Sequence, residues 1–480
     1  MSGAGSAASD VSSLLVRGGT VIDPAGARQA DVLVQGEQIV DVGPDLDVQA
    51  GHVLDAAGAY VVPGGIDVHT HLALPVGAVV AADDFESGTL AAACGGTTCV
   101  IDFAGAGREP WEEALATWHA RASGRAVIDY GFHLTVTELP EDLEAAVERF
   151  GAFAKQGITS VKLYMAYPDR LMVDDDTLAR ALQASRQTGV GVCVHAEDGA
   201  TIEALTARAL AEGRNGPDAI PTVRPPSVEA DAIRRAAVLA GAAGGWLYVV
   251  HLSSEEGLRA VLDARAAGVD IHVETCPQYL YLDRAHLDAG EVDFVCAPPL
   301  RGAPDREALW VALGAGDVEL VSTDHCPFTL ADRRRGTTGA GWKSFTEIPG
   351  GLGGVETRCS LTFQGVGSVR FSLERWVELT SGAPARLFGL DHRKGAVRPG
   401  YDADLVVFDP TATRRLDAAS LHSRSDHSPY EGTTVTGWAA LTLARGRIVA
   451  ADGEPADPAA GWGQFVPRRA VRQGPRPSLR

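Results

Sequence analysis

From Pro63 to about residue 390, apolar strand-like runs alternate with helical runs rich in Ala, Leu and Arg. The strand-like runs span 65–71, 97–103, 128–136, 160–166, 191–196, 246–252, 271–275 and 318–323, and the clearest helical runs span 112–123, 141–156, 176–188, 228–243 and 255–267. Eight such strands in roughly 330 residues are typical of a (β/α)8 barrel, a TIM-like α/β fold, with insertions. The alternative, an open doubly wound sheet, requires a Gly-rich phosphate loop after the first strand. A His-x-His segment occupies that place, so we predict the barrel.

Short strands separated by Gly and Asp turns flank the barrel on both sides. Residues 12–62 have an all-β pattern, which returns in 397–409 and 440–450. We therefore expect the N- and C-terminal segments to pair in one small β-sandwich domain beside the barrel. The predicted organisation is a disordered tail (1–11), an N-terminal sandwich segment (12–62), the barrel (63–395), a C-terminal sandwich segment (396–466) and a basic C-terminal tail (467–480), either mobile or lying on a neighbouring subunit.

The composition narrows the class of protein. A formal net charge of −20 argues against a nucleic-acid partner. The 7 Cys are an odd number and form no CxxC pair, which predicts reduced thiols in a cytoplasmic protein. The sequence contains no apolar run of about 18 residues, and residues 1–10 lack the pattern of a signal peptide. We expect a cytoplasmic protein with no membrane or nucleic-acid partner.

The first predicted barrel strand carries Asp67, His69 and His71 at alternate positions, so the three side chains point to the same face. Two imidazoles in this arrangement can bind one metal ion. Because the chain has 13 His in 480 residues, chance alone gives about 0.35 His-x-His pairs. The pair alone is therefore weak support for a metal site. The interpretation depends on further candidate ligands downstream in the sequence.

Four further candidate ligands lie near the C-terminal ends of later predicted strands: Lys162, His195, His251 and Asp324. The active site of such a barrel is formed at these strand ends. A lysine is costly to bury as a cation and would repel metal ions. A carbamate formed from its neutral amine and CO2 would instead be an anion able to bridge two ions. Taken singly, Lys162 could equally be a salt-bridged lysine, and each His is more simply a hydrogen-bonded core residue.

Together the six residues offer four imidazoles and two carboxylate-type ligands, a set suited to two zinc-like divalent ions. Two such ions share a hydroxide and polarise a carbonyl, which predicts hydrolysis of an amide-like bond. Asp102 and His133 are interpreted as structural, and His325 as pointing away from the site. The run Arg333–Arg335 is interpreted as solvated.

With these motifs in view, the chain resembles the cyclic amidohydrolases, most closely the dihydropyrimidinase/D-hydantoinase family, from about residue 14 to 467. The resemblance is carried by PGGIDVHTH (63–71), AADDFESGT (81–89), VKLYMAY (161–167), ETCPQYL (274–280), STDHCPF (322–328), IPGG (348–351) and SGAPARLFG (381–389). It implies hydrolytic ring opening of 5,6-dihydropyrimidines or 5-substituted hydantoins to N-carbamoyl amino acids. It also implies two divalent ions, with zinc expected, and a homo-oligomer, either a tetramer or a dimer.

The resemblance assigns the metal ligands as follows: His69 and His71 to the more buried ion, His195 and His251 to the second, and Lys162, as N6-carboxylysine, to both. Asp324 binds the first ion and acts as general base, then protonates the leaving nitrogen.

For the substrate, the resemblance implies that Tyr167 hydrogen-bonds the developing oxyanion. The backbone at Ala297 and Gly350 holds the amide edge of the substrate, at positions where the family commonly has Ser and Asn. We expect the exocyclic group of the substrate to meet the segment 72–80 and Tyr164, which are apolar or aromatic.

Three related groups are the alternatives. Dihydroorotases carry an Arg where this chain has Ala73. Allantoinases share the CAPPL (296–300) and SPYEG (428–432) segments but typically have an acidic residue where Leu74 stands, so allantoin is the second-ranked substrate. Non-enzymatic relatives have lost ligands, whereas all six positions are filled here, which leaves a catalytically inactive binding protein as the least favoured interpretation.

Overall fold

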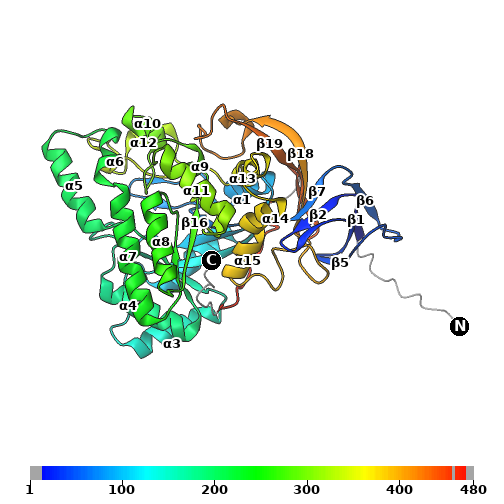
Figure 1. Cartoon of the computed structure of the whole chain (residues 1–480), viewed down its shortest axis with the longest axis horizontal. Coiled ribbons are helices and arrows are strands. Elements are labelled where there is room, and N and C mark those ends of the chain that lie inside the picture. Colours follow the sequence, from blue (N-terminus) through cyan, green and yellow to red (C-terminus); the bar gives the residue numbers. More distant parts are fainter. Residues whose placement is uncertain (1–12, 457–459, 472–480) are drawn as a thin grey trace.

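The computed structural model describes residues 13–456 and 460–471 (Figure 1), so the predicted tail 1–11 lies outside the described residues. An eight-stranded sheet, with its strands in chain order and parallel to their neighbours, forms the barrel. Its strands are β8 (Gly65–Thr70), β11 (Thr97–Ala104), β12 (Asp129–Thr135), β13 (Ser160–Tyr164), β14 (Gly191–His195), β15 (Leu247–Val249), β16 (Ile271–Thr275) and β17 (Leu320–Val321). A parallel bridge between Thr70 and His325 brings the two edges together. The barrel prediction is confirmed.

Helices cover the outside of the barrel (Figure 1). Those following the strands include α1 (Phe85–Cys94), α2 (Trp111–Ala122), α3 (Leu143–Ala154), α4 (Asp175–Thr188), α7 (Pro226–Ala243), α8 (Glu255–Ala266), α11 (Ala303–Ala315) and α13 (Arg358–Gly367). The strands are buried on both faces, as in β11, where every residue is buried. This explains why they appear in the sequence as continuous apolar runs rather than as alternating ones.

Insertions lie at the C-terminal ends of the strands. The hairpin β9 (Pro75–Val76) and β10 (Val79–Val80) follows β8. Further insertions contain α5 (Gly199–Ala211), α6 (Ile220–Val223), α9 (Gln278–Tyr281), α10 (Ala285–Asp288) and α12 (Leu330–Arg335). They build the walls of the site described below.

The termini form a separate sheet domain, at the right of Figure 1. One sheet has the order β5 (Gln38–Gly43), β4 (Asp31–Gln35), β1 (Ser13–Arg17), β6 (His52–Asp55). The other has the order β21 (Glu454–Pro455), β20 (Arg447–Ala451), β19 (Thr434–Ala444), β18 (Leu405–Arg415), β7 (Tyr60–Pro63), β2 (Thr20–Asp23), β3 (Gly26–Gln29). The antiparallel pairing of β18 with β7 joins the two ends of the chain, as predicted.

The C-terminal segment differs from its prediction. The sequence predicts a mobile or intersubunit tail that includes Arg468, but the side chain of Arg468 is buried against the barrel. Its guanidinium donates to Phe132 O and, at 2.9 Å, to Ser160 Oγ. A buried cation needs such acceptors, and the barrel strands β12 and β13 supply them. Arg468 is therefore not part of a mobile tail, and its partners belong to the barrel of its own chain.

All the cysteines are buried and unpaired: Cys94, Cys99, Cys193, Cys276, Cys296, Cys326 and Cys359. Over residues 13–456 and 460–471, no helix combines the length and apolar character needed to cross a bilayer.

Candidate active site

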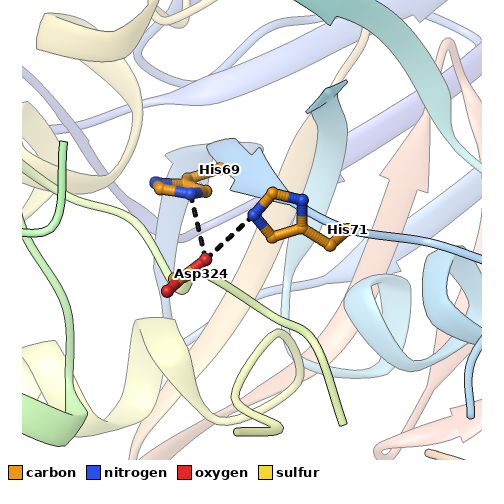
Figure 2. Close-up of side chains that lie close together, drawn as sticks. All are labelled: His69, His71 and Asp324. Atoms are coloured by element: carbon orange, nitrogen blue, oxygen red, sulfur yellow. Dashed lines mark ion pairs between the residues drawn. The ribbon is translucent and has the colours of Figure 1, made fainter. Parts of the chain in front are cut away.

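Three predicted ligands converge where β8 and β17 end (Figure 2). Successive side chains on β8 point to opposite faces, so His69 and His71 share one face. The Nε2 atoms of both histidines lie 3.0 Å from the same oxygen, Oδ1 of Asp324. One ligand atom from each of the three residues fits within a 4.8 Å span.

The residues of this cluster fit a divalent cation. His69 Nε2 is buried and has no hydrogen-bond partner, although it lies 3.0 Å from Asp324 Oδ1. Two imidazoles and a carboxylate aimed at a common point are a donor set that zinc prefers.

The other two histidines form a second pair beside the first. His251 Nε2 lies 2.9 Å from His195 Nδ1, and the ring of His251 lies 5.5 Å, centre to centre, from that of His69. His195 Nε2 is hydrogen-bonded at 2.8 Å to the buried carboxylate of Glu197, which fixes its ring orientation. Predicted ligands from separate strands are thus brought together.

Lys162 is buried next to this pair, 1% exposed. Its Nζ lies 4.7 Å from the ring centre of Phe103 and 5.1 Å from that of Tyr164. Burial lowers the pKa of Lys162 to about 8. The amine is therefore partly neutral near pH 7, which is the form that reacts with CO2.

A cavity of about 380 Å³ opens above these ligands. Among the residues that line it are all six predicted ligands, the predicted substrate contacts Tyr167, Ala297 and Gly350, and the apolar group Leu74, Pro75, Val76 and Tyr164. Leu72, at the start of the predicted exocyclic segment, is instead packed in the core.

The region of the chain that contains the barrel matches a known protein family. A model of the amidohydrolase family matches residues 60–449, which includes all eight barrel strands. The chain belongs to the amidohydrolase family. D-hydantoinase of Geobacillus stearothermophilus is 42% identical over 463 residues, 95% of this chain and 96% of that protein. D-hydantoinase of Streptomyces coelicolor is 39% identical over 464 residues, 95% and 97% of the two chains.

Solved structures agree with the curated relatives. The crystal structure of dihydropyrimidinase from Brevibacillus agri NCHU1002 superposes with a TM-score of 0.92 at 40% identity. The superposition covers 96% of this chain and 100% of the dihydropyrimidinase chain. The resemblance to the hydantoinase and dihydropyrimidinase group is confirmed.

In this amidohydrolase, three site residues have left-handed backbone. The φ angles of Tyr167, His251 and Asp324 are +66°, +44° and +53°. Such angles are uncommon outside glycine and cluster at functional sites, where the surrounding structure holds them. Loop geometry of this kind could not be predicted from the sequence.

The charges of the first cluster are coupled. Burial alone would raise the pKa of Asp324, but His69 and His71 bring that pKa well below its ordinary value. Conversely, burial would lower the pKa of His69, but Asp324 and Glu274 raise it to about 9. Asp324 is therefore a carboxylate at neutral pH.

Two buried carboxylates support the ligands, and sequence reasoning gave neither a role. Glu274 is hydrogen-bonded to His69 Nδ1 and accepts from Tyr248 Oη at 2.7 Å and from the backbone N of His251 at 3.1 Å. Glu197 orients His195 through the hydrogen bond to its Nε2. In the sequence, the available signal for Glu274 was a carboxylate near the end of strand β16. The signal for Glu197 was a carboxylate two residues beyond the end of β14.

Arg224 is a further residue that the sequence did not reveal. Its guanidinium binds Glu197 and lies 5.2 Å from the ring centre of Tyr167. Burial raises the pKa of Tyr167, and Arg224 opposes part of that rise. Tyr167 therefore remains a hydroxyl donor at neutral pH, next to a cation that favours negative charge nearby.

The polar residues interpreted as structural do have structural partners. Asp102 accepts at 2.8 Å from Leu72 N and from Thr70 Oγ1, and His325 Nε2 lies 3.0 Å from Asp83 Oδ2. His133 Nδ1 is 2.6 Å from Ser160 Oγ, and its Nε2 is 2.9 Å from Val68 O.

Asp67 does not join the ligands, although it shares their face of β8. It accepts from Thr323 N at 3.2 Å and from Thr323 Oγ1 at 2.6 Å. It thereby fixes the residue that precedes Asp324.

The interpretation of Arg333 as solvated is wrong. The side chain of Arg333 is buried, and Nη1 donates to Pro349 O at 3.0 Å and to Val295 O at 3.3 Å. These loops carry Gly350 and lead to Ala297, so Arg333 braces the predicted substrate-binding backbone.

Proposed function

We propose that this protein hydrolyses five- or six-membered cyclic amides and imides, 5,6-dihydropyrimidines or 5-substituted hydantoins, to N-carbamoyl amino acids. The observation that carries the proposal is the convergence of His69, His71 and Asp324 at the base of the cavity. Relatives named D-hydantoinase and a solved structure named dihydropyrimidinase support the substrate class.

The ligands divide into two groups. His69, His71 and Asp324 would hold one divalent ion and His195 with His251 a second, with carbamylated Lys162 between them. Zinc is the proposed metal because imidazole and carboxylate ligands suit it. When bound, the two ions would activate a water molecule and polarise the scissile carbonyl.

Asp324 would move the proton. Its low pKa keeps the carboxylate ionised, so it can accept a proton from the attacking water. The hydroxyl adds to the ring carbonyl carbon, the carbon–nitrogen bond breaks, and Asp324 returns the proton to the leaving nitrogen. One water is consumed and one ring opened.

Tyr167 and the cavity backbone would position the substrate. The Tyr167 hydroxyl would donate to the oxygen that gains negative charge, and Arg224 behind it favours that charge. Backbone groups at Ala297 and Gly350 line the cavity and would bind the amide edge.

The cavity wall favours an apolar ring substituent. Leu74, Pro75, Val76 and Tyr164 line it. Ala73 offers no cation for the carboxylate of dihydroorotate, and Leu74 stands where allantoinases typically have an acidic residue. Dihydrouracil, dihydrothymine and 5-substituted hydantoins are therefore preferred to allantoin.

We further propose a cytoplasmic homo-oligomer, tetramer or dimer, with no nucleic-acid partner. The net charge of −20 and the buried, unpaired thiols support the compartment and the lack of a nucleic-acid partner. The assembly rests on the family resemblance.

The test combines metal content per subunit with initial rates on dihydrouracil, hydantoin, allantoin and dihydroorotate. We expect about two catalytic zinc ions, rapid turnover of dihydrouracil or hydantoin, and loss of both metal and activity in Lys162→Ala. Lys155→Ala, which removes an exposed lysine directly after α3, is the matched control and should behave as wild type. Turnover of allantoin alone, or normal activity in Lys162→Ala, would contradict the proposal.

A further inference from the structure

A second cluster of metal-ligating side chains lies outside the catalytic cavity. Cys94, Glu356 and His422 each offer one ligand atom, and these atoms lie within 4.8 Å of one another. Cys94 is fully buried and Glu356 is 4% exposed, whereas the His422 side chain is 16% exposed. None of the three lines the catalytic cavity.

Three distant parts of the chain build this cluster. Cys94 is the last residue of α1, Glu356 lies before α13, and His422 lies between β18 and β19. Gly95 allows the close approach, since a Cβ there would lie 1.9 Å from Glu356 O. Helix α1 packs against β20 and β21, so the cluster lies at the junction of barrel and sheet domain (Figure 1).

The hydrogen bonds orient His422 as a metal ligand would be oriented. Its backbone N donates to Glu356 Oε2 at 2.8 Å, and its Nδ1 lies 2.9 Å from Glu356 Oε1. Its other ring nitrogen, Nε2, lies 3.2 Å from Glu454 Oε2. A carboxylate on the outer nitrogen of a histidine fixes the tautomer that binds metal through the inner one.

We propose that Cys94 Sγ, a Glu356 carboxylate oxygen and His422 Nδ1 bind a single divalent zinc-like ion in a non-catalytic site. Thiolate, imidazole and carboxylate are a zinc donor set, and a water would complete a tetrahedron. An ion would need the Nδ1–Oε1 separation to open from 2.9 Å to about 3.4 Å. The partial exposure of His422 gives the ion a path of entry.

Binding must release protons, because each ligand binds in its deprotonated form. Burial raises the pKa of Cys94, so its thiol is protonated before the ion binds. Hydrogen bonds with Cys94 and Glu356 raise the pKa of His422. The carboxylate of Glu356 would also attract a divalent ion, and at least the thiol proton would leave as the ion binds.

Cobalt(II) tests the site directly, because the proposed catalytic ligands include no thiol. The metal-free protein loaded with cobalt should show a near-ultraviolet thiolate-to-cobalt absorption band. Cys94→Ala should lose this band and one bound ion per subunit, with turnover of cyclic substrates unchanged. Cys359→Ala, which removes another buried cysteine, and Cys326→Ala, at the catalytic cavity, should both keep it.

A second readout needs no variant at the buried cysteine. Zinc added to wild-type protein whose catalytic site is already loaded should release protons, measured by calorimetry in buffers of different ionisation enthalpy. His422→Gln, at the more exposed ligand, should abolish this release. No cobalt–thiolate band in the wild type, or a band that survives Cys94→Ala, would overturn the proposal. The cobalt and calorimetry results do not depend on the proposed function, because they would be the same if the protein turned over no cyclic amide.

Discussion

At the scale of single residues, the chemistry of Lys162 depends on its burial. With a pKa of about 8, instead of the ordinary 10.5, roughly one molecule in ten carries the neutral amine at pH 7. Without burial the fraction would be about 3 in 10,000. Burial in the fold therefore favours the neutral amine of Lys162, the form that the proposed carbamylation requires.

This gives a pH-dependent prediction. The neutral fraction falls about tenfold for each pH unit below the pKa. At fixed dissolved CO2 and metal, we expect the rate of reactivation of metal-free protein to rise about tenfold per unit up to about pH 8 and then to level. Samples taken during reactivation and assayed together at one pH measure this rate. A flat profile, or reactivation that does not depend on CO2, would contradict a carbamate on Lys162.

The six candidate ligands could be identified from the sequence because they stand out as polar residues within or directly after apolar strands. Their supporting residues were not. Arg224 reaches Glu197 from 27 residues further along the chain, and Glu274 on β16 reaches His69 on β8, two strands away in the barrel. Such contacts depend on the three-dimensional arrangement of the strands, which periodicity along one strand does not contain.

At the scale of elements, helix α12 (Leu330–Arg335) acts through one buried side chain. Arg333 donates to four backbone carbonyls, those of Val292, Val295, Pro349 and Gly351. Burial lowers the pKa of Arg333 to about 10, so the guanidinium remains charged at neutral pH. It links two loops that run beside the cavity.

We expect Arg333→Met to weaken substrate binding more than catalysis. The variant leaves several carbonyls without a donor, each at a cost of about 1–3 kcal/mol if it stays buried. The loops carrying Ala297 and Gly350 should relax, which raises KM about tenfold for a loss of about 1.4 kcal/mol in binding, with a smaller change in kcat. Steady-state kinetics on dihydrouracil measure both constants.

Arg334→Met is the matched control, because it removes an exposed arginine from the same helix. It should leave KM unchanged. Equal KM values in the two variants, or a loss confined to kcat in Arg333→Met, would show that Arg333 does not position the substrate loops.

The elements themselves were predictable to different degrees. All eight barrel strands were identified because burial on both faces leaves apolar runs. Strand β17 is reduced to Leu320–Val321, and β19 begins at Thr434 rather than at 440. The inserted segments such as α6 and α12 are short, and their conformation is set by tertiary contacts that local patterns do not encode.

At the scale of the whole molecule, one buried lysine joins the two domains. Lys394 is 2% exposed, and its Nζ lies 2.8 Å from Asp129 on the barrel strand β12 and 2.9 Å from Asp402. It also pairs with Asp404, just before β18 of the sheet domain. Burial alone would lower the pKa of Lys394, but these carboxylates raise it well above its ordinary value.

Lys394→Met should therefore destabilise the fold. Removing one partner of a buried ion cluster leaves uncompensated charge and costs about 3–5 kcal/mol. We expect unfolding at a lower urea concentration. The midpoint is measured by the fluorescence of the barrel and, separately, by that of the sheet domain. Lys343→Met, at an exposed lysine, is the control and should unfold at the wild-type midpoint.

The pH dependence separates charge from packing. In wild type, Lys394 stays protonated across the accessible range, so its pairs persist. In Lys394→Met, Arg445 still pairs with Asp129 and Arg393 with Asp402. The loss of the lysine should therefore raise chiefly the pKa of Asp404 above the unfolded value of about 4. A carboxyl group whose pKa is higher in the folded than in the unfolded state stabilises the fold at pH values below its unfolded pKa. This contribution is lost as the pH rises through the pKa of the folded state. The deficit relative to wild type should therefore be larger at about pH 7.5 than at about pH 4.5. An equal deficit at both values would mean that Lys394 stabilises the junction through the packing of its stem and not through its charge.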